Sequence, residues 1–154
     1  MSRFEARSLP PAGVHPGLDL PEALSLRLDR AGNGFLVSMM RSEVARRKRN
    51  HGALTVLSQS LSRLGRHAEG RDVDERLVAL SPKHPVAHYN LACSRALTED
   101  APGALDSLER AVRLGFHDAD YVLADPDLVS LHGFPRFQSL VQTLRAGASR
   151  PSGT

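Results

Sequence analysis

Glu75-Arg76-Leu77-Val78-Ala79-Leu80 and Glu109-Arg110-Ala111-Val112-Arg113-Leu114 form the clearest internal match in this chain. Four of the six positions are identical when the first stretch is laid on the second. We call the offset from Glu75 to Glu109 the repeat shift. The same offset aligns Gly70 with Ala104, and both are small residues. A unit that repeats at about 34 residues is typical of proteins built from stacked pairs of helices.

Each of the two units predicts two helices joined by a turn. In the first unit, residues 51–84, apolar residues recur every three or four positions, and Gly65 suits the left-handed conformation that ends a helix. In the second unit, residues 85–117, Pro85 opens the first helix and Gly115 closes the second. The apolar residues that set this spacing are Leu54, Leu57, Leu61 and Leu64 in the first unit and Ala104, Leu105, Leu108, Ala111, Val112 and Leu114 in the second.

The residues before these units fall into two parts. Residues 1–19 hold three prolines and show little periodicity, which predicts a flexible lead. Residues 20–50 predict two helices, with Gly32 and Gly34 as the break between them. The second of these helices, about Phe35–Lys48, carries apolar residues at helical spacing and is interpreted as the second helix of a degenerate half repeat.

The residues after the second unit predict a cap. Asp125 suits the N-cap of a helix and Pro126 its first residue, and a last helix is expected to end near Leu144. Residues 118–146 are therefore assigned to capping helices, and residues 147–154 to a flexible tail. A stack of repeats needs a cap because each unit buries its apolar face only against a neighbour. The residues expected to supply this cover are Tyr121, Leu128, Leu131, Phe134, Phe137, Leu140, Val141 and Leu144.

The repeat resembles the tetratricopeptide repeat family. The resemblance rests on Tyr89-Asn90-Leu91-Ala92 in the first helix of the second unit and on small residues such as Ala104 in the second helix. It extends over about residues 35–146, and the closing segment is similar to the end-of-group cap of some bacterial proteins. The resemblance implies an all-α fold, an α-α superhelix of antiparallel helix pairs with C-terminal capping helices.

Some positions depart from the pattern of that family. Asp74 stands where the matching residue one repeat later is Leu108. Arg95 and Leu61 stand where the family usually has a large aromatic side chain. These departures predict either a divergent first repeat or a helix that is unusually exposed. The acidic residues interpreted together as a solvated turn are Asp72, Asp74 and Glu75.

The resemblance also implies a binding surface. Members of the family line a concave groove with the first helix of each pair, here about Ala53–Leu64 and Val86–Leu97. Such a groove would hold an extended peptide or a helix of another protein. Tyr89 is the best single anchor because tyrosine offers a large contact area with a polar tip, and the alternative is that Tyr89 packs between helices. The predicted groove residues are Thr55, Gln59, Ser62, Arg63, Val86, Tyr89, Asn90, Cys93 and Leu97.

Charge and composition narrow the choice of partner and compartment. The chain has 154 residues, a net charge of +3 and a single cysteine, Cys93, so no internal disulfide forms and a cytoplasmic, reducing location is expected. Its apolar runs are far shorter than the roughly 20 residues that span a bilayer, so no membrane association is expected.

A basic run in the N-terminal part is a possible patch for an acidic partner. The run consists of Arg41, Arg46, Arg47, Lys48 and Arg49. No aromatic residue interleaves with it, so nucleic acid is not favoured as the partner. The alternative is a solvated helix face with favourable charge at the end of the helix.

Neither catalysis nor metal binding is predicted. His84 and His88 are four residues apart, but Cys93 falls on another face of the helix. No acidic residue is placed to orient a Cys93–His88 pair, and Asp125 and Asp127 are interpreted as helix caps. We therefore expect no enzyme activity, no metal and no cofactor.

Two kinds of function agree with these features. The first is an adaptor or scaffold that holds a partner segment in the groove. The second is a structural or regulatory subunit of a larger bacterial assembly, which would use the N-terminal helix and the convex face. The least protected apolar residues of that helix are Phe35, Leu36, Met39 and Met40.

Overall fold

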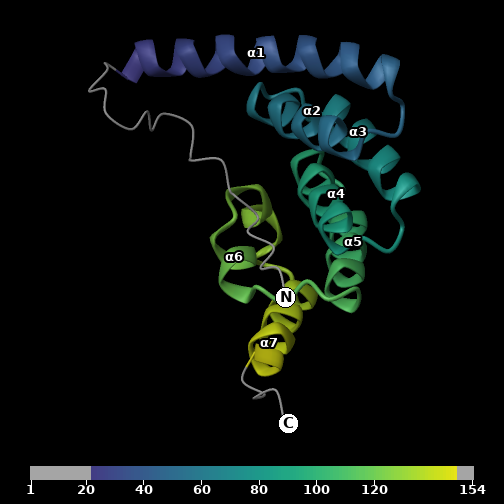
Figure 1. Cartoon of the computed structure of the whole chain (residues 1–154). Helices are drawn as coiled ribbons and strands as arrows, with labels where there is room; N and C mark the ends of the chain where they lie inside the picture. Colours follow the sequence, from purple (N-terminus) through teal and green to yellow (C-terminus); the bar gives the residue numbers. More distant parts are fainter. Residues whose placement is uncertain (1–21, 149–154) are drawn as a thin grey trace.

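The structure, a computed structural model, describes residues 22–148, and Figure 1 shows them as a chain of helices. The described residues contain no strand, which confirms the all-α prediction. The predicted lead, residues 1–19, lies outside the described part. The helices are α1 (Glu22–Arg46), α2 (His51–Arg63), α3 (His67–Leu80), α4 (Pro85–Leu97), α5 (Ala101–Arg113), α6 (Ala119–Ala124), the 3₁₀ helix η1 (Pro126–Leu131) and α7 (Pro135–Ala148).

Helix α1 is continuous, so the expected break at Gly32 and Gly34 is wrong. A glycine inside a helix costs only about 1 kcal/mol relative to alanine, which the packing of neighbouring turns can offset. Val37 and Val44 supply that packing, because both are buried against the cluster that α2 and α3 form. The first half of α1 extends beyond the other helices (Figure 1).

The next four helices begin where the repeat spacing places them. Helices α2 and α4 begin at His51 and Pro85, and α3 and α5 begin at His67 and Ala101. Both steps equal the repeat shift between the two matching stretches of the sequence. Each helix from α1 to α4 packs against the next one along the chain. The described part of the chain therefore packs mainly through neighbours in sequence.

The turns within the two helix pairs share one backbone conformation. Gly65, which follows α2, has a φ of 74°, and Glu99, which follows α4, has a φ of 62°. Gly115, at the end of α5, also has a positive φ, as expected for Gly65 and Gly115. Glu99 therefore adopts a conformation that normally favours glycine.

The buried apolar side chains form two clusters, one on each side of α4. The first cluster joins α1, α2 and α3 to the start of α4 and contains Val37, Val44, Ala53, Leu54, Leu57, Leu61, Leu77 and Ala87. The second joins α4 and α5 to the C-terminal helices and contains Tyr89, Ala92, Cys93, Ala96, Ala104, Leu105, Leu108, Ala111, Ala119, Val122, Leu128, Leu131, Phe137, Val141 and Leu144.

The C-terminal helices cover the second helix pair. η1 packs against α4, and α7 packs against α5 and α6. Five of the residues expected in this cover belong to the second cluster, and Leu140 packs against it. Phe134 and Tyr121 differ, because their side chains are exposed. The last helix continues through Ala148, beyond the predicted end near Leu144.

Candidate binding pocket

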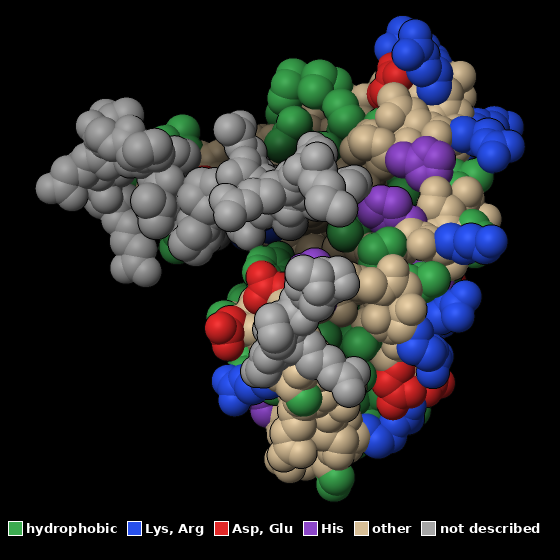
Figure 2. Space-filling view, turned by 60° about the horizontal axis from the view of Figure 1, so that its bottom comes forward, with side chains coloured by type: hydrophobic (Ala, Val, Ile, Leu, Met, Phe, Trp, Pro, Cys, Tyr) green, Lys and Arg blue, Asp and Glu red, His purple; other side chains and the backbone are tan. Residues whose placement is uncertain are grey.

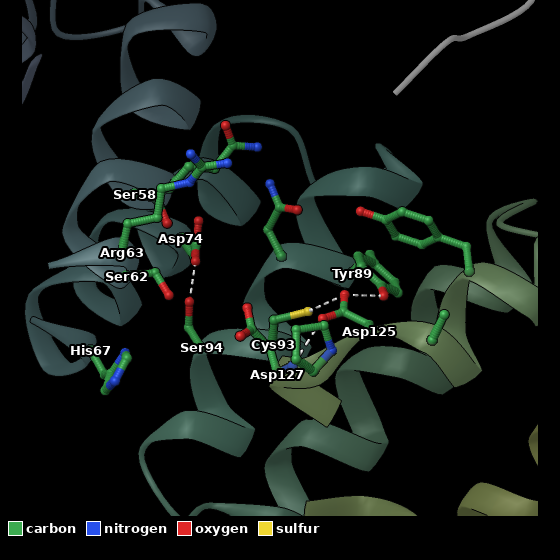
Figure 3. A pocket seen from close by; sticks show the side chains of 15 residues that line it. Ser58, Ser62, Arg63, His67, Asp74, Tyr89, Cys93, Ser94, Asp125 and Asp127 are labelled. Atoms are coloured by element: carbon green, nitrogen blue, oxygen red, sulfur yellow. Dashed lines mark hydrogen bonds between the residues drawn. The ribbon is translucent and has the colours of Figure 1, made fainter. Parts of the chain in front are cut away.

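A concave pocket of about 500 Å³ lies between the first helix pair, α4 and the segment that joins α6 to η1 (Figure 3). Residues from five elements and their connecting segments meet there. The lining residues are Ser58, Gln59, Ser62, Arg63, His67, Asp74, Tyr89, Asn90, Cys93, Ser94, Tyr121, Ala124, Asp125, Pro126 and Asp127.

The structure brings most of the predicted groove residues to this pocket. Thr55, Val86 and Leu97 are not among the lining residues. Val86 and Leu97 lie in the first and last turns of α4, whereas the pocket is opposite the middle of that helix. The predicted residues that line the pocket are Gln59, Ser62, Arg63, Tyr89, Asn90 and Cys93. That these residues bind a partner stays a prediction.

Tyr89 is a core residue rather than an exposed anchor. Its side chain is 3% exposed, and its ring stacks on Phe116 with the ring centroids 4.4 Å apart. The Tyr89 hydroxyl donates a hydrogen bond to Oδ2 of Asp125 at 2.6 Å. Tyr89 therefore packs between helices, which was the alternative to a groove anchor. It contributes only part of the pocket wall.

Asp125 links the second helix pair to the cap. Its Oδ1 accepts the backbone N–H of Asp127 at 2.9 Å, which confirms the expected N-cap. Its Oδ2 accepts the Tyr89 hydroxyl and, at 3.7 Å, the thiol of Cys93. Burial, followed by nearby negative charge, raises the pKa of the Tyr89 hydroxyl and of the Cys93 thiol. Both groups therefore remain protonated donors to Asp125.

Asp127 faces the pocket from the first turn of η1. Within residues 22–148 its carboxylate makes no hydrogen bond and no ion pair, and the side chains that influence its pKa are Asp125 and His67. Burial and, to a smaller degree, the negative charge of Asp125 raise the pKa of Asp127, while His67 lowers it. Asp127 is thus a half-buried carboxylate with no bonded partner in the described structure.

Asp74 brings a second unusual carboxyl group to the pocket. The side chain is 1% exposed and accepts a hydrogen bond from the Ser94 hydroxyl at Oδ2. Its Oδ1 is buried without a hydrogen-bond partner, and the Ser58 hydroxyl donates to the Gly70 carbonyl at 3.5 Å. Burial raises the pKa of Asp74 to about 6, against the opposing effect of the Ser94 and Ser58 hydroxyls.

This burial corrects two expectations about α3. The helix is not unusually exposed at Asp74, because Asp74 and the matching Leu108 of α5 are both fully buried. Asp72 and Glu75 are exposed, as expected, but they lie within helix α3 rather than in a connecting turn, and Asp74 is not part of that surface. The repeat register, rather than the polarity of the side chain, decides the burial of this position.

One group of side chains has the spacing of metal ligands among the described residues. The ligand atoms of Cys93, Asp125 and Asp127 all lie within 4.8 Å of one another. A metal ion would need the Cys93 thiolate, and the raised pKa of this thiol opposes its formation. His88, which the sequence put beside Cys93, instead has its Nε2 at 2.9 Å from the Pro82 carbonyl.

The basic run lies apart from the pocket. Arg41 pairs with Glu69, and Arg46 and Arg47 both pair with Glu43. Arg46 is in the last turn of α1, where a positive charge stabilises the helix. Figure 2 shows Lys and Arg side chains gathered along one outer edge of the molecule. That the basic run of Arg41, Arg46, Arg47, Lys48 and Arg49 binds an acidic partner stays a prediction.

Sequence reasoning missed the C-terminal wall of the pocket. Asp125-Pro126-Asp127 was interpreted only as the start of a capping helix. One more repeat shift places Asp127 on Cys93, a predicted groove residue, so the spacing itself contained the missing signal. The lining residues outside the prediction are Ser58, His67, Asp74, Ser94, Tyr121, Ala124, Asp125, Pro126 and Asp127.

No protein-family model matches this chain, and no curated protein matches it in sequence. Among the described residues, none of the helices combines the length and the apolar character needed to cross a bilayer.

Proposed function

We propose that this chain is a non-catalytic binding protein of the tetratricopeptide type that holds a segment of another protein in the concave pocket. The observation that carries the proposal is the origin of the pocket walls. Most of the lining comes from the first helix of each pair and from the segment that starts the cap, and smaller parts come from α3 and α6. The walls present hydrogen-bonding side chains beside apolar ones. Grooves of this composition suit an extended peptide or a helix.

The superhelical arrangement is part of the proposal, and two features support it. The helix pairs α2–α3 and α4–α5 begin one repeat shift apart, at His51 and Pro85, which is the length of a tetratricopeptide unit. Helices α1 to α5 pack against their sequence neighbours, and C-terminal helices cover the last pair, as a solenoid requires. In this arrangement α1 takes the place of the second helix of a preceding half repeat.

Binding is favoured over catalysis by the chemistry of the pocket. The Cys93 thiol, the strongest candidate nucleophile, is buried and its pKa is raised, which is opposite to the activation that a catalytic thiol needs. Both oxygens of Asp125 accept hydrogen bonds within the protein. We therefore propose a partner protein, with no cofactor, rather than a reaction.

Affinity capture from the native cells tests the proposal. The double variant Gln59→Ala with Asn90→Ala changes two pocket residues that belong to neither apolar cluster. Gln142→Ala, an exposed glutamine on α7, is the control. We expect a specific partner that the wild type and the control retain and the double variant loses, with equal helix content by circular dichroism. Retention by all three proteins would contradict the pocket as the binding site.

A second candidate function rests on the exposed apolar side of α1. A soluble helix seldom exposes this many large apolar side chains on adjoining turns, and such patches often mark interfaces. The chain would then act as a structural or regulatory subunit. Dimerisation or a stable complex that Phe35→Ser abolishes, measured by light scattering, would favour this candidate. The residues concerned are Leu24, Leu28, Phe35 and Met39, with Leu36 and Met40 half-buried beside them. Leu26 is also exposed, but helical spacing places it on the other face, in line with Val37 and Val44.

A further inference from the structure

We propose that the pocket selects a basic side chain of the partner segment and seats its ammonium or guanidinium group beside Asp127. This inference rests on the proposed function, because it specifies the chemistry of the segment that the pocket would hold. Three observations carry it: an unpaired carboxylate, a buried acceptor without a donor, and an adjoining apolar wall.

The first observation is the distribution of charge around Asp127. The neighbouring Asp125 already accepts three donors, from Tyr89, Cys93 and the backbone of Asp127. The Asp127 carboxylate has no such bond within the described residues. Arg63, the guanidinium-bearing residue of the lining, lies on the opposite side of the pocket (Figure 3). A cation from a partner would therefore meet a carboxylate that forms no ion pair with any residue of the described part of the chain.

The second observation comes from a different helix. Asp74 of α3 borders the same pocket, and its Oδ1 is buried with no hydrogen-bond partner. The Ser58 hydroxyl, which lowers the pKa of Asp74, donates to the Gly70 carbonyl at 3.5 Å. A buried acceptor without a donor is unfavourable, and a charged group with several N–H donors would bond Asp127 while its positive charge also acts on the Asp74 carboxyl group. Lysine and arginine are the protein side chains with that property and a positive charge.

The third observation is the apolar surface beside the carboxylates. Tyr121, Ala124 and Pro126 line the pocket next to Asp125 and Asp127. The methylene stems of lysine and arginine pack well on such surfaces while the charged group reaches a polar partner. The pocket volume of about 500 Å³ is large enough for one long side chain and part of its backbone.

Selection of random short peptides on the full-length protein tests the inference. We expect the selected peptides to share one lysine or arginine at a fixed position. Replacing that residue by norleucine, which keeps the stem and removes the charge, should weaken binding at least tenfold, which corresponds to the loss of about one charge-assisted hydrogen bond. Lysine and arginine versions of one peptide, compared by calorimetry in the presence of EDTA, identify the preferred group.

Protein variants supply the matched control. Asp127→Asn and Asp72→Asn remove the same charge, but Asp72 is an exposed residue of α3 outside the pocket. We expect the first variant to weaken a basic peptide about tenfold and the second to leave its affinity unchanged. The norleucine peptide tests the same contact without any change to the protein. If Asp127→Asn fails to fold, this peptide still shows whether the positive charge contributes to binding.

The outcomes separate this inference from the proposed function. Peptides that lose affinity for Gln59→Ala with Asn90→Ala, yet need no basic residue, would overturn the basic side chain and leave the pocket as the binding site. Peptides that bind equally well to the pocket variants, or no selected peptide at all, would overturn both. A basic peptide whose affinity is insensitive to Asp127→Asn would also contradict the inference.

Discussion

The helix pairs α2–α3 and α4–α5 share their spacing but differ in what they bury. Asp74 in α3 and Leu108 in α5 are equivalent positions, and both are almost completely buried. Asp74 accepts a hydrogen bond from Ser94. The residue equivalent to Ser94, one repeat shift later, is Leu128, and Leu128 is buried in the same apolar cluster as Leu108. The first interface is therefore polar at a site where the second is apolar.

The polar interface is the one that borders the pocket. Asp74 and Ser94 both line it, whereas Leu108 and Leu128 lie in the core of the second cluster. A buried carboxyl group opposes folding unless its hydrogen bonds are complete, and a leucine at the same position stabilises the folded state. The first pair therefore gives up stability at the position where it contributes to the pocket.

The largest effect is expected when the second pair receives the residue of the first. Leu108→Asp places a carboxyl group in the apolar cluster without a serine at position 128, so it loses the packing of leucine and buries an unpartnered polar group. We expect the free energy of unfolding to fall by about 4 kcal/mol or more. Chemical denaturation measures it, with Leu108→Ala as the control that isolates the loss of packing. Equal losses in the two variants would contradict the role of the polar group.

Removal of the ionisable group at Asp74 is expected to stabilise the protein in a pH-dependent way. The folded pKa of about 6 is above the ordinary value of 3.8, so the native state binds the proton more tightly than the unfolded chain. The contribution of this group is therefore fully present below about pH 4 and is lost as the pH rises through about 6.

Asp74→Asn removes this pH dependence and keeps an acceptor for Ser94. We expect it to raise the free energy of unfolding at pH 8 by up to about 3 kcal/mol, since one unit of pKa corresponds to about 1.4 kcal/mol. The gain should shrink between pH 6 and pH 4 in urea titrations at several pH values. A gain that is the same at every pH would show that the carboxyl group does not titrate as described.

A smaller effect is expected at the turns, where Gly65 and Glu99 share a left-handed backbone. Glu99→Gly should stabilise the protein by up to about 1 kcal/mol, because glycine adopts positive φ without a steric cost. Gly65→Ala should destabilise it by about 1 kcal/mol for the same reason. Thermal unfolding of both variants measures these opposite shifts, and shifts of the same sign would contradict the shared turn conformation.

The smallest effect is expected at Gly70, the counterpart of Ala104. A Cβ atom at Gly70 would lie 3.5 Å from the Ser58 carbonyl, an ordinary contact. Gly70→Ala should therefore increase the helix propensity of α3 without a clash and stabilise the protein by about 0.5 to 1 kcal/mol. Denaturation in urea checks the gain, and a loss of stability would show that α2 and α3 need the glycine for their close approach.

The repeat spacing of the sequence predicted more of the structure than the chemical type of individual residues did. The repeat shift placed the helices of both pairs and the turn at Gly65, because a packed helix stack fixes the distance between equivalent positions. The break at Gly32 and Gly34 was wrong, because tertiary packing overrides a weak local preference. The burial of Asp74 could not be inferred from its charge, since its serine partner is 20 residues away in α4.

For the pocket, too, the repeat spacing predicted some walls and did not predict others. Its α2 and α4 walls followed from the repeat, whereas the wall at Asp125 and Asp127 depends on how the cap folds back on α4. The side-chain type of Tyr89 favoured a groove anchor and left packing between helices as the alternative, and stacking on Phe116 buries the side chain. The repeat shift from Cys93 to Asp127 indicates the position of this wall, whereas the stacking of Tyr89 on Phe116 leaves no local pattern in the sequence.

Site-specific photo-crosslinking in the native cells would locate the surface that binds a partner. A photoreactive amino acid replaces Gln59 in the pocket, Phe35 on α1 or Gln142 on α7, in three separate proteins. We expect a discrete adduct with one partner protein from position 59 and none from position 142. An adduct that forms from position 35 and not from position 59 would contradict the pocket as the binding site and would favour α1 as the interface.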